Sequence, residues 1–260
     1  MKLKEIYDKI DLYYPKRLSD EYVSVYGGRD NSGILIDAGK EITGAVFSLD
    51  FSKGALKEAE ERGYNLIVTH HPAIFFPISS IRIDDPLGAR ILSALEGSVS
   101  VVSMHLNMDC AEGGIDESLA LAVGAKKVPA PQEPLEKGGY GRIFDLDEIE
   151  YSALIEKLKA VLHTQRIFSY GEEGRIRRAA SFCGAGVDAG AISAARKGGA
   201  DVIVSADIKH NFICDALESG LRVVQLTHYA SENYGFMKIY HTLKDKLGIP
   251  STYHEDKFML

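Results

Sequence analysis

The stretch Asn65-Leu66-Ile67-Val68-Thr69-His70-His71-Pro72 joins a short apolar run directly to two histidines and a proline. The consecutive apolar and β-branched residues predict a buried strand over 66–69. The two histidines therefore stand where that strand ends. In open α/β sheets, ligands bind in the crevice beyond the carboxyl ends of the strands, so this stretch indicates both a fold class and the place of a site.

Short β-branched runs alternate with longer amphipathic segments along the rest of the chain, which is typical of an α/β protein. Further strands are predicted over 42–49, 99–104, 179–183, 201–205 and 222–226. Helices are predicted at the N-terminus and over 52–62, 86–95, 115–123, 152–163, 189–197, 210–218 and 230–246. Ser52 and Asp85 are the expected N-caps of two of these helices. Residues 128–141 contain three prolines and three glycines, which favours a loop or a crossing between two lobes.

The composition excludes several classes of protein. A chain of 260 residues with 45% hydrophobic and 26% charged residues is expected to be globular, not collagen-like or disordered. Its net charge of −7 makes it a poor generic binder of nucleic acid or anionic membranes. The N-terminal residues lack the apolar core of a signal peptide. Three scattered cysteines without a CxxC pair indicate a reducing compartment, so we expect a cytoplasmic protein.

Two other polar strings also follow predicted strands. They are Met104-His105-Leu106-Asn107-Met108-Asp109 and Thr227-His228-Tyr229-Ala230-Ser231-Glu232. Histidine, aspartate and glutamate are the ligands of Zn, Mn, Fe and similar divalent ions. Each string alone is more often structural, because a histidine at a strand end or a glutamate at a helix start is common. Their combination at three strand ends favours a metal site.

The spacing within the strings suits two ions. His228 and Glu232 lie four residues apart, so they share one face of a helix. His70 and His71 are consecutive at a strand end and point to opposite sides, which suits neighbouring ions better than a single ion. With Asp109, these residues could hold two ions that share a bridging carboxylate and leave positions open for water.

A second pattern competes with this interpretation. The residues from Gly184 to Ala189 fit a G-x-G-x-x-G/A dinucleotide fingerprint between a strand and a helix, and Asp207 lies about 20 residues further on. The same glycines also suit close packing of a strand against a helix. The neighbouring Lys209, His210 and Asn211 could contact substrate or simply begin a solvated helix.

The three strings resemble the dinuclear-metal-centre family called GTP cyclohydrolase 1 type 2-like, whose eukaryotic branch is called NGG-interacting factor three-like. The resemblance extends over nearly the whole chain and also covers Asp30-Asn31-Ser32-Gly33, Ala111 to Asp116 and Ala206 to His210. It implies two α/β lobes with a metal site in the cleft, and a ring-shaped homohexamer. The implied metal ligands are His70, His71, Asp109, His228 and Glu232, with Glu232 as the bridge and His105 in or beside the ligand shell.

Three positions depart from the family pattern. Asn211 stands where a second histidine is usual, Ala206 replaces a glycine, and Arg29 replaces a tryptophan. The metal ligands are kept, so these departures affect the substrate contacts.

These observations predict a cytoplasmic metal-dependent hydrolase with two divalent ions, His105 as general base or positioning group, and a small-molecule substrate. The family label points to a purine nucleotide, GTP. The alternatives are a non-catalytic metal-binding scaffold protein and a nucleotide-binding module that uses Gly184 to Ala189.

A shared site also predicts how the chain is threaded. His70, His71 and Asp109 precede the crossing at 128–141, whereas His228 and Glu232 follow it. We therefore expect residues 1–127 and 222–260 to form the first α/β lobe, which carries the metal site. Residues 128–221 are expected to form the second α/β lobe.

Overall fold

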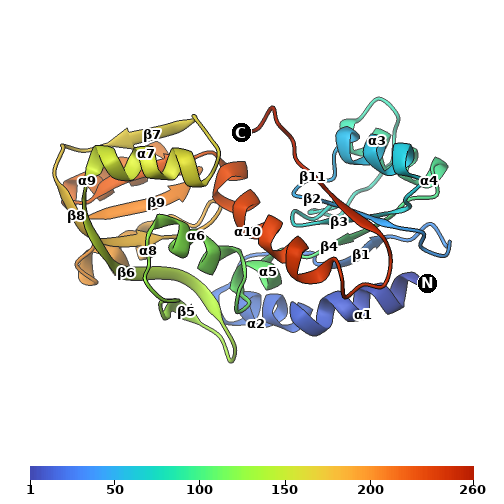
Figure 1. The fold of residues 1–260 in the computed structure, drawn as a ribbon, viewed down its shortest axis with the longest axis horizontal. Coiled ribbons are helices and arrows are strands. Elements are labelled where there is room, and N and C mark those ends of the chain that lie inside the picture. Colours follow the sequence, from blue (N-terminus) through green and yellow to red (C-terminus); the bar gives the residue numbers. More distant parts are fainter. The chain divides into compact units, whose positions relative to one another are not determined.

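A computed structural model describes residues 1–260, and the chain divides into two compact units (Figure 1). The first unit comprises Met1–Ala111 and Phe236–Asp256. The second comprises Glu112–Gly235 and Lys257–Leu260. Each unit contains one sheet with helices packed against it, so the expected α/β class is confirmed.

The first unit is built on a five-stranded sheet. Its order is β1 (Gly33–Ile36), β4 (Ser100–Ser103), β3 (Leu66–Thr69), β2 (Ala45–Ser48) and β11 (Ser251–His254), all parallel except β1. Every residue of β2, β3 and β4 is buried, as expected of parallel strands covered on both faces. Its helices are α1 (Leu3–Tyr13), α2 (Lys16–Tyr26), α3 (Lys53–Arg62), α4 (Pro86–Glu96) and α5 (Leu106–Cys110), joined by the later part of α10 (His228–Leu243).

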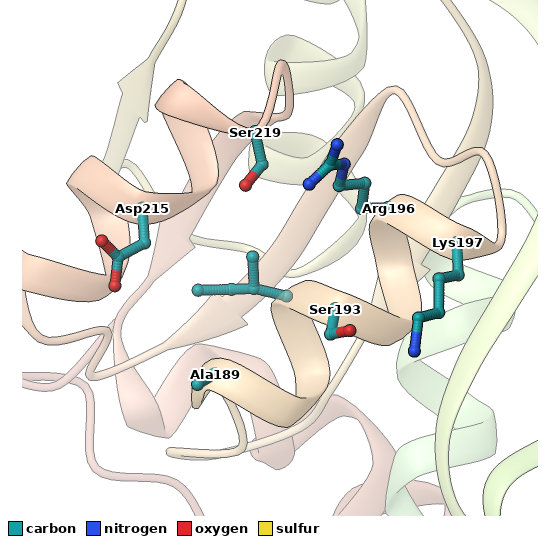
Figure 2. A pocket seen from close by; sticks show the side chains of 7 residues that line it. Ala189, Ser193, Arg196, Lys197, Asp215 and Ser219 are labelled. Carbon is teal, nitrogen blue, oxygen red and sulfur yellow. The ribbon is translucent and has the colours of Figure 1, made fainter.

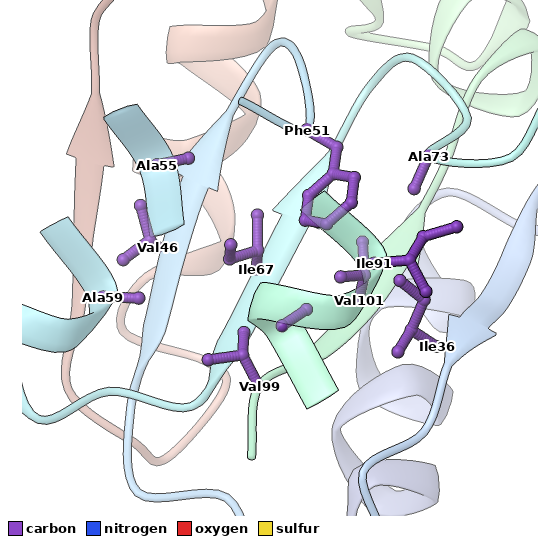
Figure 3. Close-up of a cluster of buried hydrophobic side chains, with 11 residues drawn as sticks. Ile36, Val46, Phe51, Ala55, Ala59, Ile67, Ala73, Ile91, Val99 and Val101 are labelled. Atoms are coloured by element: carbon purple, nitrogen blue, oxygen red, sulfur yellow. The ribbon is translucent and has the colours of Figure 1, made fainter. Parts of the chain in front are cut away.

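An apolar cluster between this sheet and α3 and α4 forms a core of the first unit (Figure 3). Strand residues Val46 and Ile67 meet small residues of α3, Ala55 and Ala59, which are one turn apart and fully buried. Both predicted N-caps are confirmed: Ser52 Oγ accepts a hydrogen bond from the Ala55 N–H, and Asp85 Oδ2 accepts one from the Gly88 N–H. The two caps fix where these covering helices begin.

The second unit is built on a six-stranded mixed sheet. Its order is β5 (Pro131–Pro134), β6 (Gly139–Glu150), β8 (Arg175–Ser181), β9 (Val202–Ala206), β10 (Arg222–Leu226) and β7 (Ile167–Tyr170). Strands β8, β9 and β10 are parallel neighbours, so their carboxyl ends lie at one edge of the sheet. The helices are α6 (Ile115–Val123), α7 (Tyr151–Val161), α8 (Ala189–Lys197), α9 (His210–Glu218) and the first two turns of α10. No helix in the chain combines the length and apolar character needed to cross a membrane.

The interpretation of 128–141 as a loop or crossing was wrong. The segment contains β5 and the start of β6, which pair in an antiparallel hairpin with Glu133 opposite Tyr140. Prolines in this segment do not prevent pairing, because β5 is an edge strand and needs fewer backbone donors. The short strands β1, β7 and β11 and the helix α2 were also absent from the sequence-based assignment.

The unit boundaries fall elsewhere than the sequence analysis placed them. Helix α6 packs on β6 and β8, and the buried Arg142 of β6 forms a 2.8 Å ion pair with Asp116 of α6. Strand β10 pairs with β9, with Leu226 opposite Ala206. Residues 112–127 and 222–235 therefore belong to the second unit. The chain rejoins the first unit from Phe236, and β11 adds to the edge of β2.

Candidate metal centre

The first unit brings His70, His71, His105 and Asp109 to one end of its sheet. His70 and His71 follow β3, whereas His105 follows β4 and Asp109 lies in the short helix α5. The two strands are parallel neighbours with Thr69 opposite Ser103, so both strings leave the sheet at the same edge. This is the strand-end position that the sequence predicts.

The side chains of this cluster lie close enough to bind one ion or two neighbouring ions. The His70 ring centroid is 4.9 Å from that of His71 and 5.1 Å from that of His105. Nε2 of His70 lies 3.5 Å from Oδ1 of Asp109, and both residues are buried. His70, His105 and Asp109 each offer a ligand atom within 4.8 Å of the others. His105 thus lies within a potential ligand group.

The second ring nitrogen of each histidine is held by an oxygen. Nδ1 of His70 lies 3.2 Å from the Met104 carbonyl oxygen, which only accepts, so this nitrogen carries the proton. Nδ1 of His71 donates to Asp50 Oδ1 at 2.7 Å, and Nδ1 of His105 donates to Asp30 Oδ1 at 2.8 Å. Each Nε2 atom is then left with the lone pair that binds a metal or a proton, an arrangement typical of metal-binding histidines.

Asp30 contacts His105, and the sequence analysis did not assign it a role. Burial of Asp30 opposes ionisation, but hydrogen bonds from His105, Ser19 and Ser32 outweigh it and hold the pKa of this carboxyl well below its ordinary value. Asp30 is therefore a carboxylate at neutral pH and holds the His105 ring by charge and geometry. The sequence pointed to Asp30 only through its place in the Asp30-Asn31-Ser32-Gly33 string, which resembles the family. No motif in the sequence pointed to Asp50.

The second unit contributes a pair from the start of α10. His228 begins this helix directly after β10, and Glu232 follows one turn later. Nε2 of His228 lies 3.2 Å from Oε1 of the buried Glu232. Nδ1 of His228 lies 2.7 Å from Oδ2 of Asp207, which follows β9. Asp207 adopts φ +47°, a left-handed conformation that is uncommon for a residue with a side chain.

The backbone at Gly184 packs closely against Glu232. Gly184 follows β8 with φ +56°, and a Cβ atom there would lie 2.4 Å from Oε1 of Glu232. Its N–H donates to Ser231 Oγ at 3.0 Å. Only glycine suits both the conformation and the close approach. The glycine that suggested a dinucleotide fingerprint is thus required by Glu232.

The other parts of that fingerprint also have structural roles. Asp188 Oδ1 caps α8 by accepting from the Ala191 N–H at 2.8 Å, which places a negative charge where a pyrophosphate would bind. Asp207 bonds to His228. An open cavity of about 490 Å³ lies between α8 and α9 (Figure 2). Its lining residues are Ala189, Ile192, Ser193, Arg196, Lys197, Asp215 and Ser219. Lys209, His210 and Asn211 are exposed at the start of α9, and His210 contacts Cys214 in the next turn.

The donors fit a divalent transition metal. Imidazole nitrogens and carboxylate oxygens are the ligands of Zn, Mn and Fe. The Nδ1 atoms of His70 and His71 contact oxygen atoms of the chain, which fix the orientation of each ring. The structure therefore contains residue groups that could hold a metal ion.

Relatives of known name match nearly the whole chain. The GTP cyclohydrolase 1 type 2 homolog of Clostridium perfringens is 31% identical over 252 residues, which cover 95% of this chain and 93% of that protein. The homolog of Methanocaldococcus jannaschii is 29% identical over 253 residues, which cover 96% of this chain and 97% of that one.

Solved structures share the fold. The Staphylococcus aureus hypothetical protein SA1388 superposes with a TM-score of 0.84 at 23% identity, covering 98% of this chain and 97% of that one. Reduced HcgD from Methanocaldococcus jannaschii superposes with a TM-score of 0.81 at 26% identity, covering 98% of each chain. The model of the family Duf34/NIF3 (NGG1p interacting factor 3) matches residues 1–255. The resemblance seen in the sequence is confirmed, and this chain belongs to the Duf34/NIF3 family.

Proposed function

We propose that this chain is a metal-dependent hydrolase that holds two divalent ions. The proposed ligands are His70, His71, Asp109, His228 and Glu232. The observation that carries the proposal is the fixing of Nδ1 by an oxygen in His70, His71 and His228, which leaves Nε2 of each ring as a ligand atom.

We further propose that the ligands of both units serve one centre and that Glu232 is the bridge. The family resemblance supports this proposal, because the ligands that it implies come from both units. A shared centre also explains why the family resemblance extends over residues of both units.

The chemistry divides between the metal and the chain. When bound, two ions would lower the pKa of a water molecule toward ~7 and polarise the bond under attack. We assign His105 as the general base: its ring is partly exposed, whereas His70 is fully buried. Nε2 of His105 takes the proton from the attacking water, and the Asp30 carboxylate on Nδ1 stabilises the resulting imidazolium.

The variant Asp30→Asn tests that assignment. An amide oxygen or nitrogen at this position no longer supplies a negative charge to His105, so we expect hydrolysis to fall by about 10²-fold or more. Metal content should stay unchanged, because the proposed ligands are kept. Loss of metal together with activity would instead assign His105 as a ligand.

The proposed substrate class is a purine nucleotide, with GTP as the first candidate. Support comes from the names of the relatives in Clostridium perfringens and Methanocaldococcus jannaschii, both GTP cyclohydrolase 1 type 2 homologs. Hydrolytic opening of a purine ring requires an activated water and a base, which the proposed centre and His105 would supply.

Elemental analysis and a hydrolysis assay test the function together. The purified protein is stripped with a chelator, reloaded separately with Zn²⁺, Mn²⁺ or Fe²⁺, and incubated with GTP and a panel of other nucleotides. We expect turnover only in a reloaded form. Binding of metal without turnover of any nucleotide would favour a non-catalytic metal-binding protein.

Variants in both units test the ligand assignment. We expect His71→Ala and Glu232→Ala to lose bound metal while far-UV circular dichroism stays unchanged. The matched control is His241→Ala, which removes an exposed histidine from the last turn of α10. If both ligand variants retain full metal, the site is misassigned.

We also propose a homo-oligomer, a hexamer, on the basis of the family resemblance, and a cytoplasmic location. Light scattering at micromolar concentration tests the assembly, because one chain has a mass of 28.5 kDa. A measured mass near that value would exclude the hexamer.

A further inference from the structure

An aromatic side chain stands exposed beside the histidine cluster of the first unit. The Phe76 side chain is 64% exposed, although aromatic rings of this size are usually buried. Its ring centroid lies 4.9 Å from that of Phe75 in an edge-to-face arrangement. The Phe75 ring in turn lies 6.0 Å from the His105 ring, again edge-to-face. Phe76 is therefore linked to the proposed base through one intervening ring, that of Phe75.

A cation accompanies this exposed ring. The guanidinium carbon of Arg29 lies 5.4 Å from the Phe76 ring centroid, within the range of a cation–π contact. Arg29 forms no ion pair with a carboxylate of the chain, so its charge is available to an anion. The next residue, Asp30, holds the His105 ring. The neighbouring residues Arg29 and Asp30 thus supply a positive charge at the surface and a hydrogen bond to the proposed base, His105.

The residues just before Phe76 are anchored to two other parts of the first unit. The Asn31 side chain donates a hydrogen bond to the Ile74 carbonyl oxygen. The Ala73 N–H donates to Ser103 Oγ at 3.0 Å, and Ala73 itself is buried in the apolar core. These bonds tie the segment to the Arg29–Asp30 string and to β4. These bonds fix the backbone just before Phe76 and just after Arg29, which lowers the entropic cost of binding.

We propose that Phe76 and Arg29 form the surface that recognises the substrate, and that this substrate is a flat aromatic ring carrying an anionic group. Bases stack on exposed aromatic side chains and on guanidinium groups. A guanidinium also pairs strongly with a phosphate or carboxylate oxygen. The proposal rests on the proposed function, because it assigns the substrate contacts of that site. It places them on two residues that the metal does not need.

The absence of tryptophan from this chain allows a direct test. The variant Phe76→Trp keeps an aromatic surface and introduces the only tryptophan of the chain at the proposed contact, which is excited selectively over the tyrosines. The matched control is Phe168→Trp, which places the fluorophore at a similarly exposed position, 61% against 64%, on β7 of the second unit. The metal-loaded protein is titrated with guanosine 5′-monophosphate, guanosine and ribose 5-phosphate.

We expect saturable quenching of Phe76→Trp by guanosine 5′-monophosphate, weaker binding of guanosine and no response to ribose 5-phosphate. Adding Arg29→Gln should weaken binding of the monophosphate by about tenfold and leave guanosine nearly unchanged. Phe168→Trp should respond only by non-saturating collisional quenching. Equal responses of the two tryptophan variants, or no effect of Arg29→Gln, would overturn the proposal.

Two further readouts separate competing explanations. Ile78, Ile81 and Ile83 are also exposed, so a second copy of the chain could cover this segment. In that case Phe76→Trp emission would shift with protein concentration in the absence of nucleotide, which would overturn the proposal. Metal content is measured on the same samples. Full metal without saturable quenching contradicts the recognition surface alone, whereas loss of metal binding by the unmodified protein contradicts the proposed function.

Discussion

The first unit places three histidines and an aspartate at one edge of its sheet, whereas the second unit contributes one histidine and one glutamate at the edge of its own. In the first unit, His70, His71 and His105 directly follow the paired parallel strands β3 and β4. In the second, the pair depends on two unusual backbone positions, Gly184 and Asp207. The comparison indicates that burying Glu232 against the backbone requires a glycine at position 184.

The units also differ in how they are held together. A core of the first unit is apolar, with alanines of α3 against strand residues. The second unit includes a buried ion pair between Arg142 and Asp116, with both side chains almost completely inaccessible. Burying such a pair is costly, and breaking it leaves an uncompensated charge. The second unit is therefore expected to be more sensitive to a single charge-removing change.

The largest effect is expected from Arg142→Met. This variant leaves Asp116 buried without its partner, which should cost about 3–5 kcal/mol of unfolding free energy. The comparison variant in the first unit is Ile67→Val, which trims a fully buried strand residue and should cost about 0.5–1.5 kcal/mol. Urea denaturation followed by circular dichroism measures both. The double variant Arg142→Met with Asp116→Asn should recover part of the lost unfolding free energy. Equal losses in Arg142→Met and Ile67→Val would remove the contrast between the units.

A smaller effect is expected from Gly184→Ala. The added Cβ would collide with Glu232, so we expect a destabilisation of about 1–3 kcal/mol and a loss of bound metal as Glu232 moves. Gly199→Ala is the control, because Gly199 also has a left-handed φ but has open space around its Cβ position. Metal content by elemental analysis separates the two. If both variants keep full metal, the close approach of Gly184 to Glu232 does not matter for the site.

The smallest change in stability is expected from Asp207→Gly, which should affect stability and metal affinity in opposite directions. Glycine relieves the left-handed strain and should leave the unfolding free energy unchanged or raise it by up to about 1 kcal/mol. Removing the carboxylate frees the His228 ring and should weaken metal binding by about 10–100-fold. Isothermal titration with Zn²⁺ and a thermal melt provide the two measurements. Metal affinity equal to that of the unmodified protein would show that Asp207 does not position His228.

Much of this arrangement could be predicted from the sequence because strands, caps and strand-end polar strings are local signals. The runs at β3 and β9, the caps Ser52 and Asp85, and the places of His70 and His228 followed from residue type and spacing. The β5–β6 hairpin could not be recognised, because its prolines resemble those of a loop until an edge position is known. Asp50 and Asp207 support their histidines from 21 residues away, and such contacts leave no pattern in a single sequence.

Anomalous diffraction from crystals loaded with Zn²⁺ or Mn²⁺ tests the central claim most directly, because it locates each ion and its ligands without reference to activity. We expect two peaks about 4 Å apart, with His70, His71 and Asp109 of the first unit and His228 and Glu232 of the second as ligands, and Glu232 between the ions. A single peak, peaks confined to one unit, or a separation of more than about 10 Å between His71 and His228 in every pair of chains would contradict a shared dinuclear centre.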